Sequence, residues 1–114
     1  MHELGTIYYV IDTVEKLMEE NDLKAVSSIT LEVGEVSGII PEYLQDFWLY
    51  AREKTDHFQQ TELRIEELKA VTYCQDCTGT YPTIPQGKIC PHCGSPNTFL
   101  VTGNEYNIKE IEAC

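Results

Sequence analysis

The amino-acid sequence predicts an α+β fold with two helices, three strands and a separate segment inserted between the last two strands. Two observations support this prediction. Apolar residues recur at helical spacing in two stretches and at strand spacing in three others. The segment 73–101, in contrast, is rich in Gly, Pro and Thr and shows little periodicity, so its order must come from something other than a large apolar core.

The first predicted helix opens the chain and ends near Asn21 and Asp22. Its buried stripe, spaced three and four residues apart, consists of Leu4, Ile7, Ile11, Val14 and Met18. A second helix is expected to start at Pro41, because proline in the first helical turn sacrifices no hydrogen bond. Its buried side is expected to comprise Leu44, Phe47, Trp48 and Ala51.

The strands are predicted from alternation. In 28–33 apolar and polar residues alternate, which predicts a strand with one solvent-exposed face. In 63–70 the apolar positions change parity halfway, and we interpret this shift as a bulge within one long strand. Tyr106 and Ile108 indicate the last strand.

The charge balance excludes some classes of partner. The chain has 114 residues, with 8 Lys and Arg against 19 Asp and Glu, a net charge of −11. Such a protein repels nucleic-acid phosphates but attracts cations and basic surfaces. No apolar run reaches membrane length, and the N-terminus resembles no signal peptide. We therefore expect a cytoplasmic protein with no nucleic-acid or membrane partner.

Four cysteines form two pairs with a metal-ligand spacing. Cys74 and Cys77 make one C-x-x-C pair, and Cys90 and Cys93 make the second. Two tight turns of this kind direct four thiolates at one ion, and zinc suits a tetrahedron of sulfurs. An iron–sulfur site and a thiol–disulfide redox pair are the alternatives. Four protein ligands leave no position for water, so the predicted zinc site is structural.

A closed zinc site does not define a function by itself. Zinc-ribbon modules serve nucleic-acid binding, enzymes and protein adaptors, and an adaptor role is the alternative reading of this chain. Apart from the thiolates, Asp76 and Lys88 are the charged side chains of 73–101, so no basic face is visible. The sequence also lacks a paired nucleophile and base and a phosphate-binding glycine loop, and we expect no enzymatic activity.

The N-terminus offers a second set of metal ligands. The Met1 amine, the His2 amide nitrogen and the His2 imidazole can close two fused chelate rings around one ion. Glu3 can add its amide or its carboxylate. Nitrogen donors of this kind favour square-planar Ni(II) or Cu(II). The alternative is an ordinary surface histidine at a frayed chain end.

Three motifs together resemble one protein family. They are Met1–Leu4 at the start, Leu31–Gly38 after the first strand, and Cys90–Ser95 in the second cysteine pair. In this order and at these distances they are similar to the HypA/HybF family, nickel metallochaperones for the maturation of [NiFe]-hydrogenases and, in some bacteria, of urease. The resemblance extends from the first residue to about Glu112.

The resemblance implies a fold and a set of sites. The fold is two helices on a small three-stranded sheet with an inserted zinc-ribbon module, divided into a nickel-binding α+β domain (1–72 plus 102–114) and a zinc-binding domain (73–101). His2 corresponds to the nickel ligand of the family and Glu3 to its neighbour that shapes or completes the site. The four cysteines correspond to the structural Zn(II) ligands, and Ni(II) is the cargo.

The resemblance also implies partners: a GTPase of the nickel pathway, and the hydrogenase large subunit or the urease maturation machinery. A monomer and a homodimer are both compatible with the sequence. One departure concerns the nickel site, because some family members carry an acidic residue where this chain has Ile39 and Ile40. Glu35 and Glu42 are the nearby candidates for a further ligand. His92, inside the second cysteine turn, is a candidate to replace a thiolate on zinc at low pH.

Overall fold

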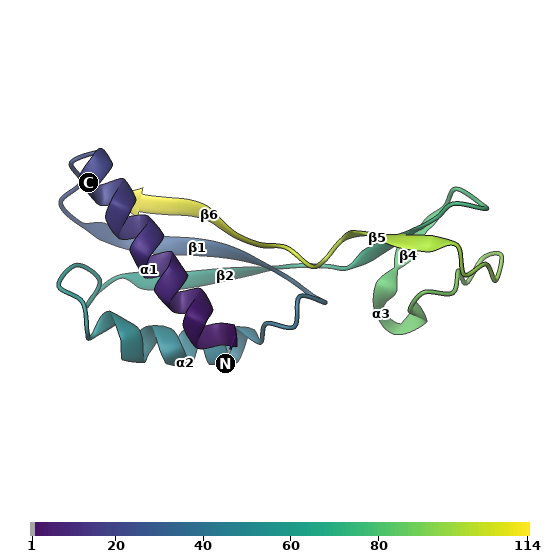
Figure 1. Cartoon of the computed structure of the whole chain (residues 1–114), viewed down its shortest axis with the longest axis horizontal. Helices are drawn as coiled ribbons and strands as arrows, with labels where there is room; N and C mark the ends of the chain where they lie inside the picture. Colours follow the sequence, from purple (N-terminus) through teal and green to yellow (C-terminus); the bar gives the residue numbers. More distant parts are fainter. Residues whose placement is uncertain (1) are drawn as a thin grey trace. The chain divides into compact units, whose positions relative to one another are not determined.

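The computed structural model describes residues 2–114, with side chains from Glu3 onward (Figure 1). Its elements are α1 (His2–Glu20), β1 (Val26–Gly34), α2 (Pro41–Arg52), β2 (Glu62–Leu68), β3 (Val71–Cys74), β4 (Thr80–Pro82), α3 (Thr83–Gln86), β5 (Thr98–Thr102) and β6 (Tyr106–Ala113). The chain divides into two compact units. The helical unit comprises Met1–Glu32, Ile39–Glu66 and Asn107–Cys114, and the cysteine unit comprises Val33–Gly38 and Glu67–Tyr106.

The helical unit follows the predicted pattern closely. Within the described residues, β2, β1 and β6 form a sheet in that order, and α1 packs against α2. The completely buried side chains of this unit include Ile7, Val10, Val14, Ile29, Leu31 and Leu44. Pro41 occupies the first turn of α2, as expected. Trp48 is buried and donates its indole N–H to the carbonyl of Thr61 at 2.9 Å, so its polar atom is satisfied inside the core. The predicted α+β fold is confirmed.

One face of β1 differs from its prediction. Ser28 and Thr30 were expected to face solvent, but they are only 2% and 6% exposed. Since β1 is the central strand, long side chains from both neighbouring strands lie over it. Ser28 donates a hydrogen bond to the carboxylate of Glu112 on β6 at 2.8 Å, and Arg64 on β2 binds the same carboxylate. The alternating polar residues of β1 therefore lie beneath charged side chains of the neighbouring strands and do not face solvent.

The prediction of one long bulged strand over 63–70 is wrong. β2 ends at Leu68 and β3 begins at Val71, and the two strands belong to different sheets. Ala70 breaks the ladder, because its N–H donates to the Glu35 carboxylate at 2.9 Å and its carbonyl accepts the N–H of Thr83 at 3.0 Å. The change of parity therefore marks a passage from one sheet to the next.

The cysteine unit contains a backbone crossing too tight for side chains. A Cβ on Gly34 would lie 2.0 Å from the Gly103 carbonyl oxygen. A Cβ on Gly103, whose φ is +120°, would lie 2.5 Å from Cα of Ala70. The N–H of Gly34 donates to the carbonyl of Glu105 at 2.8 Å, which fixes the crossing. Glycine is therefore required for close approach of three chain segments.

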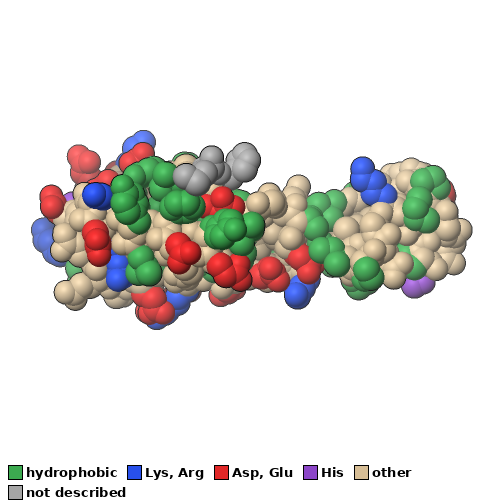
Figure 2. Space-filling model, turned by 90° about the horizontal axis from the view of Figure 1, so that it is seen from below, with side chains coloured by type: hydrophobic (Ala, Val, Ile, Leu, Met, Phe, Trp, Pro, Cys, Tyr) green, Lys and Arg blue, Asp and Glu red, His purple; other side chains and the backbone are tan. Residues whose placement is uncertain are grey.

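Charge is distributed unevenly over the surface. Figure 2 shows acidic side chains spread over the helical unit and few of them around β4 and β5.

Of the described helices, none is both long and apolar enough to cross a membrane.

Candidate metal centres

Each cysteine pair lies in a tight turn, and the two turns share one hydrogen-bond pattern. The N–H of Thr78 donates to the carbonyl of Cys74 at 2.9 Å, and the N–H of Gly94 donates to the carbonyl of Cys90 at 2.8 Å. The equivalent turn residues, Thr78 and Gly94, have positive φ values of 61° and 74°. Glycine takes this conformation without steric cost, whereas nothing in the sequence indicates that a threonine takes it in the first turn.

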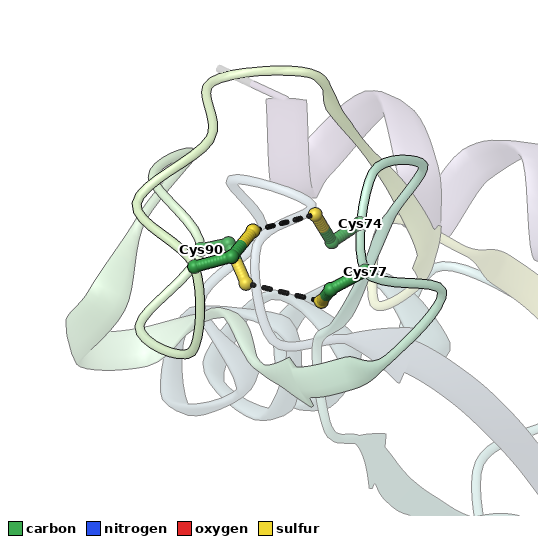
Figure 3. A group of neighbouring side chains, drawn as sticks. Cys74, Cys77 and Cys90 are labelled. Atoms are coloured by element: carbon green, nitrogen blue, oxygen red, sulfur yellow. Dashed lines mark hydrogen bonds between the residues drawn. The ribbon is translucent and has the colours of Figure 1, made fainter.

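These turns bring the four thiols together (Figure 3). All four Sγ atoms lie within 4.8 Å of one another. The Sγ atoms of Cys74 and Cys93 are 3.6 Å apart, and those of Cys77 and Cys90 are 3.7 Å apart. A tetrahedral zinc with Zn–S bonds of about 2.3 Å would hold its sulfurs roughly 3.8 Å apart. The donor set therefore fits a structural zinc site, in agreement with the sequence prediction.

The pKa values of the cysteines indicate that the cluster needs a cation to ionise fully. Burial of Cys90 opposes its ionisation, but the backbone N–H groups of Cys93 and His92 outweigh this effect and lower the pKa of Cys90 to about 6. At Cys93 the N–H of Ser95 favours the thiolate, yet the neighbouring thiol of Cys74 and burial raise its pKa to about 12. Four thiolates at this spacing repel one another, so a divalent ion is needed for all of them to ionise.

Polar side chains beside the cysteines tie the two turns to each other. The hydroxyl of Ser95, after the second pair, donates to the carboxylate of Asp76 inside the first pair. The N–H of Gln75 donates to the carbonyl of Asn97 at 3.0 Å. In the sequence, Ser95 appeared only as the end of the Cys90–Ser95 motif, without a role of its own, and Asn97 was not singled out; their signal was a polar residue just after the second C-x-x-C pair. Such outer contacts orient metal ligands.

The cluster also forms the small core of its unit. Cys74, Cys90 and Tyr81 are buried against each other, while Cys77 and Cys93 are exposed. The hydroxyl of Tyr81 donates to the carbonyl of Gly87 at 2.9 Å, which satisfies its polar end. Since two of the three buried members are proposed ligands, little apolar packing remains to hold this unit without its ion.

The second predicted site lies at the start of α1. Met1 and the side chain of His2 are outside the described residues, whereas the backbone of His2 begins the helix. Glu3 is buried at 8% exposure. One of its carboxylate oxygens accepts the N–H of Ile40 at 3.2 Å. Ile40 is the N-cap of α2 and has no side chain able to cap it, so Glu3 supplies from another helix what a capping-box glutamate normally supplies from within.

The remaining candidates are dispersed. Glu35 binds the N–H of Ala70 and lies 3.7 Å from Lys69 Nζ, and so belongs to the cysteine unit. Glu42 is exposed in the first turn of α2. His92 is exposed, and its N–H donates to Cys90 Sγ at 3.4 Å. Among the described residues, the cysteine cluster is the only group of three or more such side chains close enough to share an ion.

Comparison with known proteins agrees with this arrangement. Residues 1–113 match the model of the family described as hydrogenase/urease nickel incorporation metallochaperone HypA. A hydrogenase maturation factor HypA from Chlorobium phaeobacteroides is 33% identical, with 97% of both chains covered. That from Aquifex aeolicus is 29% identical, covering 98% of this chain and 96% of the relative.

Solved structures show the same fold. A solution structure of the Ni metallochaperone HypA from Helicobacter pylori superposes with a TM-score of 0.70 at 21% identity, covering 97% of this chain and 96% of that one. Another HypA solution structure gives a TM-score of 0.75 at 22% identity, with 100% and 97% covered.

The fold and the cysteine cluster thus define a small α+β protein with an inserted zinc-ribbon-like module. The chain belongs to the HypA family of nickel metallochaperones.

Proposed function

We propose that this protein binds Ni(II) at its N-terminus and delivers it, together with a partner GTPase, for maturation of a [NiFe]-hydrogenase. The proposed ligands are the Met1 amine, the His2 amide nitrogen and the His2 imidazole, with Glu3 as the neighbouring acidic group. Hydrogenase is the proposed client because the curated relatives are named as hydrogenase maturation factors, and urease is the second client class in the family description.

The observation that carries this proposal is that α1 begins at His2. The first N–H groups of a helix have no acceptor within the helix, so the amides of His2 and Glu3 can lose a proton without breaking its hydrogen-bond ladder. The positive end of the helix dipole favours the deprotonated amides. Ni(II) can then occupy a site of backbone and imidazole nitrogens while the helix stays intact.

Glu3 has a positioning role in this proposal. Its carboxylate already accepts the N–H of Ile40, which links the first turn of α1 to the start of α2. Both residues lie in the helical unit. A buried carboxylate held in this way fixes the first turn, so the amide nitrogen of His2 faces the ion in one orientation.

The cysteine cluster has a separate task, which is to hold one Zn(II) and thereby order the cysteine unit. Cys74, Cys77, Cys90 and Cys93 are the proposed ligands, and the equal hydrogen-bond patterns of their two turns support this role. The net charge of −11 would draw cations and a basic partner surface toward the protein, an effect that salt should weaken. A reducing cytoplasmic location, also proposed, would keep the thiols available to zinc.

Nickel titration followed by calorimetry tests the terminal site. We expect stoichiometric Ni(II) binding by the protein with its native N-terminus. His2→Ala and a version with extra residues before Met1 should both lose it, because each removes one of the chelating nitrogens. Zinc should stay at one ion per chain in all three proteins.

The matched control is His57→Ala, which removes an exposed histidine elsewhere in the helical unit and should leave nickel binding unchanged. Equal nickel uptake by the native and extended proteins would end the proposal.

A further inference from the structure

Each exposed thiol of the cysteine cluster lies against a buried thiol of the other turn. Cys93 is exposed, and its Sγ atom lies 3.6 Å from that of the buried Cys74. Cys77 is exposed, and its Sγ atom lies 3.7 Å from that of the buried Cys90. Both contacts cross from one turn to the other (Figure 3). The four thiols therefore form two cross-turn pairs, each with one member open to solvent.

This arrangement makes the two members of a pair unequal toward an oxidant. The thiolate is the form of cysteine that reacts with peroxides, and metal-bound cysteines are already deprotonated. Peroxide in solution can reach the sulfur atoms of Cys77 and Cys93, whereas Cys74 and Cys90 are buried. The first oxidation should therefore occur at the exposed member, and a buried thiol of the other turn then lies in contact with the oxidised sulfur.

The two turns are also joined by contacts that do not involve an ion. The carboxylate of Asp76 accepts hydrogen bonds from the Ser95 hydroxyl and, at 3.5 Å, from the Asn97 side-chain amide. The N–H of Gln75 donates to the carbonyl of Asn97 at 3.0 Å. Each of these bonds links the first cysteine turn to the residues that follow the second. The sulfur atoms of the two turns should therefore stay within reach of each other after one bond to the ion has broken.

We propose that the cysteine cluster is a peroxide-sensitive site, at which oxidation replaces the zinc ion by two disulfides across the turns. One disulfide joins Cys74 to Cys93, and the other joins Cys77 to Cys90. The proposed oxidant is hydrogen peroxide.

The chemistry is the same in both pairs. The exposed thiolate attacks one oxygen of the peroxide, the O–O bond breaks, and the departing hydroxide takes up a proton to become water. The buried thiolate then attacks the sulfur of the resulting sulfenic acid, the S–S bond forms, and the sulfenic oxygen leaves as a second water after taking up a proton. For the whole cluster, four thiolates lose four electrons, two peroxides become four waters, and Zn(II) departs without a change of oxidation state.

The pairing across the turns determines what happens to the fold. Cys74, Cys90 and Tyr81 form only a small buried cluster, so the unit depends on a link between its two turns. A disulfide within one C-x-x-C pair would leave the turns unlinked once the ion had gone. A cross-turn disulfide joins the same two turns as the ion does, and it restricts the unfolded chain. The oxidised unit should therefore keep its fold without zinc.

Oxidation of the zinc-loaded full chain with hydrogen peroxide tests this inference, which rests on the proposed zinc site. Zinc is measured before oxidation, and a chain that holds none at that stage contradicts the zinc site itself. A chelating dye should then detect one zinc ion released per chain. Mass spectrometry of non-reduced peptides should find the two cross-turn disulfides, and dithiothreitol with added zinc should restore the starting protein.

NMR spectra distinguish oxidation from simple loss of the ion. The amide signals of 73–101 should stay dispersed in the oxidised, zinc-free protein. They should collapse in reduced protein from which a chelator has removed the zinc. An oxidised protein whose signals collapse in the same way overturns the proposal, as does a protein that keeps both its zinc and its thiols in peroxide.

Cys93→Ser tests the pairing. It leaves Cys77 and Cys90 as the remaining cross-turn pair, so after oxidation Cys74 should still react with a thiol reagent. Cys114→Ser is the matched control, because it removes an exposed cysteine outside the cluster and should leave both disulfides and the zinc release unchanged. A disulfide within a C-x-x-C pair, in the native protein or between Cys74 and Cys77 in Cys93→Ser, overturns the proposal.

Discussion

The helical unit and the cysteine unit each contain a small sheet, but they are held together by different means. In the helical unit, apolar side chains from α1, α2 and β1 are completely buried. In the cysteine unit, Cys74, Tyr81 and Cys90 form a small buried cluster, and Val33 and Ala70 are buried elsewhere in the unit. The first unit therefore has an apolar core of the usual kind, and the second replaces much of that core by a metal and its ligands.

This difference explains why the two halves of the sequence have such different character. Helices and strands that bury a face need periodic apolar residues, and the helical unit has them. Around a metal, order comes from bonds between the ion and its ligands, so Thr, Pro and Gly can fill 11 of the 29 positions of 73–101. A substitution that removes a metal ligand should therefore leave the helical unit folded, and a substitution in the apolar core should leave the metal site intact.

The largest effect is expected from Cys90→Ser. It removes a buried ligand whose pKa is already lowered to about 6, so we expect zinc content to fall from one ion per chain to none. Structural zinc binding contributes about 10–16 kcal/mol, more than a unit with so small a core can lose and stay folded. NMR spectra should lose the dispersed amide signals of 73–101, while circular dichroism should retain the signal of α1 and α2.

Cys114→Ser is its control, because Cys114 is exposed and is not part of the cluster. This variant should keep its zinc. If Cys90→Ser retained a full zinc complement, the cluster would not be the zinc site.

Leu44→Ala tests the contribution of the apolar core to the stability of the helical unit. Leu44 is completely buried in α2, and its truncation should lower the free energy of unfolding of the helical unit by about 2–5 kcal/mol. Urea denaturation followed by the fluorescence of Trp48, the single tryptophan, measures this loss. Bound zinc should not change. The exposed Leu49, substituted in the same way, should alter stability by less than about 0.5 kcal/mol, and comparable losses from both leucines would contradict this account.

A smaller effect is expected at the backbone crossing. Gly34→Ala brings a Cβ to 2.0 Å from the Gly103 carbonyl oxygen, so strands must move apart, at a cost of about 1–3 kcal/mol. Gly5→Ala is the opposite case, since nothing lies within 4 Å of the new Cβ in α1, and it should stabilise the helix by about 0.5–1 kcal/mol. The unfolding temperature should therefore fall in Gly34→Ala and rise in Gly5→Ala. Equal shifts would mean that the crossing tolerates a side chain.

The sequence predicted the parts of the fold that depend on local pattern. The helical periodicity of 4–18 and the proline at the start of α2 were sufficient for both helices. Burial of Ser28 and Thr30 could not be predicted, because it depends on which strands flank β1 and how long their side chains are. The break between β2 and β3 depends on hydrogen bonds from Ala70 to distant residues.

The sites show the same limit. Ligand spacing was enough to predict the cysteine cluster, because the chemistry of the ion restricts it. The positive φ of Thr78 has no signal in sequence, since threonine seldom takes this conformation. The contact of Glu3 with Ile40 joins residues far apart in the chain, and it was invisible for that reason.

The strand order of the helical unit also has a consequence for how the protein is made. β1 lies between β2 and β6, and β6 is the last element of the chain. During synthesis on the ribosome the cysteine turns emerge before β6, and closing them requires only short loops. We therefore expect the two cysteine turns to bind their ion first, while β1 keeps one unpaired edge until β6 has left the ribosome. In that interval the open edge of β1 is able to pair with a strand of a neighbouring chain.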